Sequence, residues 1–201
     1  MTTRTTRRSI LIPLTLAAGL TACGARTEAT MTNAIDQSGP KKARLRDAMD
    51  QGTVVRAATP SAKQFADLAT KNDAFEIAAA RLAQSKSTSP AIRAYAAKMI
   101  AAHAGLTARI TKAAAAARPA IAPDASSTQD YDAKLAELRT LSGAAFDQAY
   151  VAGQIHEHHV ALSLYELYAR GGEDSSLKAA AIAIVPIVKS HIAMAEALAA
   201  K

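Results

Sequence analysis

The chain has 201 residues, of which half are apolar, only 4% are aromatic, none is Trp and one is Cys. Much of the apolar content is alanine, which has the highest helix propensity, so the composition favours an all-α protein. The lone Cys excludes an internal disulfide. The net charge of +7 comes without any Lys/Arg run interleaved with aromatic residues, which argues against nucleic-acid binding.

Residues 1–22 have the pattern of a lipoprotein signal peptide that ends before Cys23. A basic start with three arginines precedes the apolar run 10–20, which is too short to span a bilayer as a mature helix. The run ends in Leu20-Thr21-Ala22-Cys23, which resembles a bacterial lipobox. This resemblance implies that the Cys23 thiol is lipidated and that Cys23 becomes the new N-terminus.

We therefore expect acyl chains on Cys23 to anchor the protein to a membrane, because each buried CH₂ contributes about 0.8 kcal/mol. Gly24 stands where an Asp would resemble an inner-membrane retention signal, which favours the outer membrane and a periplasm-facing domain. Residues 23–58 are polar and mixed, as is typical of a flexible tether. An ordinary cleaved signal with an incidental Cys is the alternative.

Residues 59–201 contain four predicted amphipathic helices, over 59–86, 90–117, 144–170 and 175–199. Ser or Thr beside proline marks the first two starts, and Gly171-Gly172 marks the turn before the last helix. Pro186 inside the last helix predicts a kink. A helical pattern also resumes near residue 130 and breaks at Ser142-Gly143.

Two short turns and one longer middle connection predict a four-helix bundle. The loop over 118–129 can extend to about 40 Å at ~3.3 Å per residue. A helix of about 27 residues also spans about 40 Å. The connection between the second and third helices can therefore run the length of the bundle, which permits the ferritin-type topology in which these two helices are parallel.

Each predicted helix directs at least one metal-capable side chain toward the core when it is drawn on a helical wheel. These side chains are Glu76, His103, His158 and His191. Within the stretch QIHEHH, only His158 shares the inner face, and His156 and His159 face water. With the first and last helices running one way and the middle two the other, the four inward residues fall within roughly 5 Å of one height.

Two interpretations of these residues stay open. Three neutral imidazoles and one carboxylate suit a single divalent transition-metal ion, namely Zn²⁺, Fe²⁺, Mn²⁺ or Cu²⁺. Alternatively, the core is polar but metal-free, with Glu76 paired to a histidinium, in a structural or interaction lipoprotein. The sequence has neither a nucleophile-elbow serine nor a Gly-rich phosphate loop, so we predict no catalytic residue.

From residue 65 to residue 198 the sequence resembles the domain of unknown function 4142 family of exported bacterial proteins. The matching stretches, which hold all four inward residues, are DAFEIAAARLAQ, MIAAH, SGAAFDQAY, QIHEHH and PIVKSH. The resemblance implies a ferritin-like bundle and an outer-membrane location, and it implies no reaction.

Two departures from that family pattern concern acids beside the histidines. The family commonly has an acid before the second-helix histidine and before the last one, where this chain has Ala102 and Ser190. The resemblance therefore implies a weaker metal site. The Glu-x-x-His pairs of di-iron ferritins are also absent, so we do not expect a di-iron centre.

Overall fold

The computed structural model describes residues 58–200, and all regular secondary structure in that range is helical. The helices are α2 Ala62–Lys86, α3 Pro90–Ala116, α4 Gln129–Thr140, α5 Gly143–Gly171 and α6 Ser175–Ala199. The all-α prediction is confirmed over this range, and the four long helices match the predicted ranges to within three residues. The predicted signal peptide, Cys23 and nearly all of the predicted tether lie outside the described residues.

Three of the four long helices begin at a capping side chain, and α5 begins after Ser142 without one. Ser61 and Gln64 form a capping box at the start of α2, in which each side chain accepts a hydrogen bond from the other residue's backbone N–H. The Ser89 hydroxyl caps α3. The Asp174 carboxylate caps α6 by accepting a 2.9 Å hydrogen bond from a backbone N–H of the first turn.

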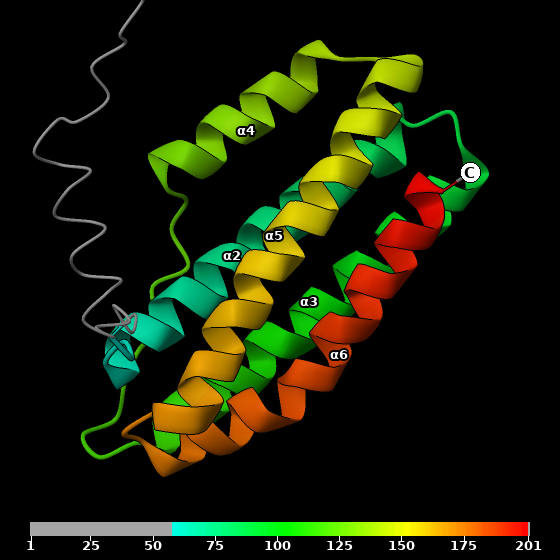
Figure 1. The fold of residues 1–201 in the computed structure, drawn as a ribbon. Coiled ribbons are helices and arrows are strands. Elements are labelled where there is room, and N and C mark those ends of the chain that lie inside the picture. The colour runs from blue at the N-terminus through cyan, green and yellow to red at the C-terminus, as the bar shows by residue number, and fades with distance from the viewer. Residues whose placement is uncertain (1–57, 201) are drawn as a thin grey trace, which may run out of the picture. The chain divides into compact units, whose positions relative to one another are not determined.

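The four long helices pack against one another in a closed order (Figure 1). α2 packs against α3 and α5, and α6 packs against the same two helices. Three-residue turns join α2 to α3 and α5 to α6, which makes the members of each pair antiparallel neighbours. The colour gradient shows α3 and α5 running in the same direction, opposite to α2 and α6.

Buried apolar side chains form two clusters, and a layer of polar residues lies between them. In one cluster Phe65 stacks on Tyr168 with ring centroids 3.9 Å apart. In the other, Phe146 and Tyr150 are buried. Each of the four long helices contributes to both clusters, and the polar layer lies at the level where these helices pass from one cluster to the other.

Leu68 is 49% exposed, although the helical wheel puts it on the edge of the apolar stripe of α2. Phe75, two turns farther along the same edge, is buried against Tyr131 of α4.

The connection between α3 and α5 contains α4, a helix of 12 residues that packs against α2 and α5. Tyr131 of α4 stacks on Phe75 of α2, with ring centroids 4.5 Å apart. Lys134 Nζ lies 2.5 Å from Oε1 of Glu157, which is buried on α5. α4 therefore covers part of the side of the molecule that α2 and α5 form.

We expect the substitution Lys134→Met to lower the free energy of unfolding by about 1–3 kcal/mol, because it leaves the buried Glu157 carboxylate without its cation. Urea denaturation measures the change. The control is Lys63→Met, which breaks a surface pair with Asp67 and should cost less than about 1 kcal/mol. Equal losses in the two variants would contradict a special role for the pair between α4 and α5.

α6 is the one helix among the described residues that is long and apolar enough to cross a membrane by composition. Such a helix is weak evidence for a span, because core helices have the same composition. Leu177, Ile184 and Val188 of α6 are buried within the protein. The helix continues through Pro186 to its end at Ala199.

Candidate metal centre

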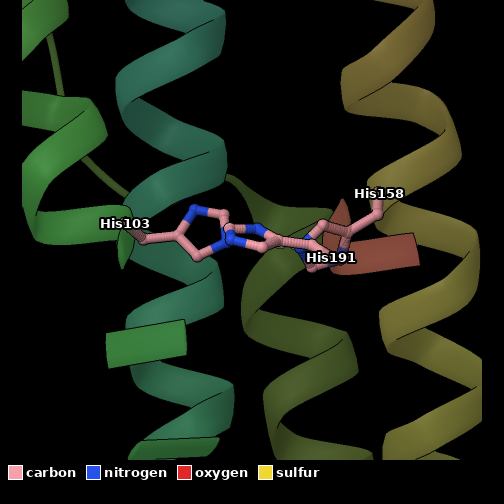
Figure 2. A group of neighbouring side chains, drawn as sticks. All are labelled: His103, His158 and His191. Carbon is pink, nitrogen blue, oxygen red and sulfur yellow. Dashed lines mark hydrogen bonds between the residues drawn. The ribbon is translucent and has the colours of Figure 1, made fainter. Parts of the chain in front are cut away.

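Three buried histidines from three helices meet in the polar layer, and Figure 2 shows their rings pointing toward one another. His103 lies on α3, His158 on α5 and His191 on α6, with exposed fractions of 2%, 1% and 5%. One ring nitrogen of each lies within 4.8 Å of those of the other two. His156 and His159 are exposed, so the orientations predicted for the histidines of α5 are confirmed.

Hydrogen bonds at the outer edges of two rings determine which nitrogen faces the centre. Nδ1 of His158 donates to the backbone carbonyl of Gln154 at 2.8 Å, which leaves Nε2 as an acceptor. Nδ1 of His103 donates to Oδ1 of Asp73 at 2.8 Å, so Nε2 of His103 also faces inward. Lone pairs of neutral His103 and His158 thus point at the same place, which a proton or a metal ion can occupy.

The separations of the inward nitrogens suit one metal ion. Nε2 of His158 is 3.4 Å from Nε2 of His103 and 3.3 Å from Nδ1 of His191. In a tetrahedral site with metal–nitrogen bonds of about 2.0–2.1 Å, neighbouring nitrogens are about 3.3–3.4 Å apart. The third pair, His103 and His191, has ligand nitrogens within 4.8 Å of each other, so the three imidazoles can bind one such ion once this pair also takes that spacing.

Asp73 of α2 was not among the predicted site residues, yet it is 1% exposed and orients a ring of the centre. Its Oδ1 accepts from His103, and its Oδ2 accepts a 2.9 Å hydrogen bond from the Thr107 hydroxyl. A carboxylate behind a histidine fixes the ring tautomer and raises the basicity of the opposite nitrogen. The sequence held a signal for this role, because Asp73 lies one helical turn before the inward Glu76.

The structure bears directly on residues 102 and 190, the two positions at which the family resemblance leads one to expect an acid. Asp73 supplies a carboxylate to His103 from another helix, although residue 102 is Ala. Ser190 is exposed, so an acid at that position would begin on the outer face of α6. The described structure thus gives His103 an acidic partner that residue 102 does not supply.

Glu76 is 1% exposed and lies beside the histidines rather than among the three converging nitrogens. Its Oε2 accepts a 2.5 Å hydrogen bond from the Gln154 side chain, whose Oε1 accepts from the Tyr95 hydroxyl. Its Oε1 has no hydrogen-bond partner among the described residues and lies 3.9 Å from Nδ1 of His158. Burial raises the pKa of Glu76 to about 7, against the opposing influence of His103 and Gln154.

The three histidines have different electrostatic surroundings. Burial, together with the charge of His103, lowers the pKa of His158 to about 3 and that of His191 to about 4. Burial also opposes the charged form of His103, but the hydrogen bond to Asp73 and the charges of Glu76 and Asp73 raise its pKa overall. Two imidazoles are therefore neutral at pH 7 and available as ligands, and His103 is the one that holds a proton most readily.

A protein-family model described as "Domain of unknown function (DUF4142)" matches residues 48–198. No curated protein and no solved structure gives a significant match to the chain.

Proposed function

This chain belongs to the family described as domain of unknown function (DUF4142), and we propose that it is an exported, lipid-anchored protein whose helical domain binds one divalent transition-metal ion. The ligands in this proposal are His103, His158 and His191, with Glu76 as the fourth. The ion is Zn²⁺, Fe²⁺, Mn²⁺ or Cu²⁺, all of which accept imidazole nitrogen and carboxylate oxygen.

The observation that carries the proposal is the convergence of three buried ring nitrogens within 4.8 Å of one another, with two of the three pairs 3.3 and 3.4 Å apart. Divalent charge also suits the surroundings, because the carboxyl groups of Asp73 and Glu76 are buried beside the neutral rings. Glu76 qualifies as the fourth ligand because its buried Oε1 lacks a partner among the described residues. A side-chain rotation would have to bring this oxygen to the ion, since it now lies on the Nδ1 side of His158.

The rest of the proposal concerns architecture and location. We assign residues 1–22 to a lipoprotein signal peptide, 23–58 to lipidated Cys23 and a tether, and 59–201 to a ferritin-like four-helix bundle. The parallel course of α3 and α5 supports the ferritin-like topology. The lipobox and Gly24 support an outer-membrane anchor with the bundle facing the periplasm. We assign no reaction to the centre.

Metal content of the purified protein tests the proposal. The chain is prepared without a histidine tag or chelator, and bound metal is measured by elemental mass spectrometry. We expect about one ion per chain in the parent and in His156→Ala, whose imidazole is exposed, and none in His158→Ala. A parent that holds no metal even after reloading would overturn the metal-binding function.

The alternative is a metal-free structural or interaction lipoprotein, and one contact favours it. The buried pair of His103 and Asp73 is complete without a metal, with Nδ1 and Oδ1 2.8 Å apart. A second proton on His103 would lie on Nε2 and donate toward Nε2 of His158 at 3.4 Å. The polar layer would then fix how the helices align. In that case the parent binds divalent metals more weakly than micromolar, and the three histidines are core residues.

A further inference from the structure

Positive charge is concentrated on α3. The described residues carry 14 Lys and Arg against 13 Asp and Glu, so their net charge is only +1. α3 nevertheless contains four cations and no acid, the cations being Arg93, Lys98, Arg109 and Lys112. The remaining described residues therefore have an excess of acids, and α3, at +4, is the most cationic helix, since α2 and α6 each carry +1.

Three of these cations share the outward face of α3. Lys98, Arg109 and Lys112 fall within an arc of about 60° on the side of the helix opposite His103, at 100° per residue. They extend over about 21 Å of helix. All three are exposed, and none forms an ion pair with another described residue. We call this set the α3 cationic face.

Small side chains lie between these cations, and neighbouring helices leave the face uncovered. The exposed residues between Lys98 and Lys112 are Arg109, Thr111, three alanines and one glycine. α3 packs mainly against α2 and α6, whereas α4 lies against α2 and α5. On α6, the acid is Glu196, which is exposed. Lys189 of α6 pairs with Glu166 of α5.

We infer that the α3 cationic face docks on a surface of anionic phospholipid headgroups. Each cation brought to such a surface strengthens binding about fivefold. Alanine and glycine between the cations let the helix lie close to a flat surface. A second copy of this chain is a poor occupant, because two such faces would bring like charges together.

The proposed lipid anchor would place the α3 cationic face near the membrane surface. The docking itself is independent of any bound metal. The 35 residues between Cys23 and residue 59 reach at most about 120 Å at ~3.4 Å per residue, which exceeds the length of any helix in the domain. Anchoring therefore permits α3 to reach the same membrane, and it raises the local concentration of headgroups.

Lysine labelling of the full chain tests the docking. The chain is mixed with vesicles of phosphatidylcholine alone or with 30% phosphatidylglycerol, and acetylation rates are measured lysine by lysine by mass spectrometry. We expect Lys98 and Lys112 to react at least fivefold more slowly on the anionic vesicles. Lys134 of α4 should react at the same rate on both. Salt at 0.5 M should remove the difference, because it shortens the Debye screening length to well below about 10 Å.

A matched pair of variants separates docking from general attraction. Arg109→Glu should abolish the slower labelling of Lys98 and Lys112, whereas Arg139→Glu, the same charge change on exposed α4, should leave it intact. Three outcomes would overturn the inference: equal rates on both vesicles, equal slowing of Lys134, or slow labelling that persists in Arg109→Glu. Equal rates on both vesicles would leave an acidic protein as the partner to seek for this face.

Discussion

The substitution Glu76→Gln should raise the free energy of unfolding of the metal-free protein by about 3 kcal/mol at pH 8 and by much less at pH 5. The reason is the pKa of Glu76, which burial raises from 4.5 to about 7 in the folded state. A pKa difference of one between the folded and unfolded states corresponds to about 1.4 kcal/mol. The glutamine of the variant can still accept the hydrogen bond of the Gln154 amide, so the change removes mainly the buried charge.

The direction of the pH effect follows from proton binding. Between pH 4.5 and 7 the folded protein holds more protons at Glu76 than the unfolded chain does. The contribution of this carboxyl to stability therefore falls as the pH rises from 4.5 to 7. Above pH 7 the contribution remains at its lowest value. Replacing Glu76 removes this loss, so the gain in the variant is largest at alkaline pH.

Urea unfolding of chelator-treated protein at the two pH values measures the effect. The control is Glu137→Gln on α4, an exposed acid whose loss should change stability by less than about 0.5 kcal/mol at both values. A variant that is less stable than the parent at pH 8 would contradict the prediction. It would mean that the Glu76 carboxylate is held by a favourable partner in the folded protein.

The substitution Asp73→Asn should weaken Zn²⁺ binding by about 10–100-fold, provided that the parent binds the ion. Asp73 accepts the Nδ1 hydrogen of His103, and loss of such an outer carboxylate typically reduces metal affinity by that factor. The neutral amide keeps the shape of the side chain but makes Nε2 of His103 a weaker ligand. Competition against a chelator of known affinity measures the change.

Asp67→Asn provides the matched control on the same helix. Its carboxylate pairs with Lys63 at the surface, away from the three histidines, so the Zn²⁺ affinity should equal that of the parent. Equal affinities in all three proteins would show that Asp73 stabilises the fold alone. Loss of binding in both variants would instead indicate that the fold is damaged.

The helix boundaries and the inward histidines could be predicted because each depends on local sequence. Ser61 and Ser89 are capping residues, and Gly172 follows the last residue of α5. A rise of 1.5 Å per residue then places His103, His158 and His191 at similar heights. These inferences need only the period of a helix and the positions of its ends.

The edges of the apolar stripes could not be assigned in the same way. On α2, Asp73 and Leu68 lie on opposite edges of the stripe, and a wheel of one helix treats them alike. α3 packs on the first edge, so Asp73 is buried against His103 while Leu68 is half exposed. The burial of Glu157 likewise depends on α4, whose position against α5 no periodicity predicts. Which neighbour covers an edge is a tertiary property.

The polar layer draws at least one residue from each of the four long helices, beginning with Asp73 and Glu76 on α2 and ending with His191 on α6. Its members are far apart in the sequence, so α2, α3 and α5 together still lack His191 and cannot form the complete site. Whenever the chain is delivered from its N-terminus, by a ribosome or through a membrane, the site stays incomplete until His191 of α6 has arrived. An ion at this centre would therefore be captured only after α6 has been delivered, from the compartment that α6 then occupies.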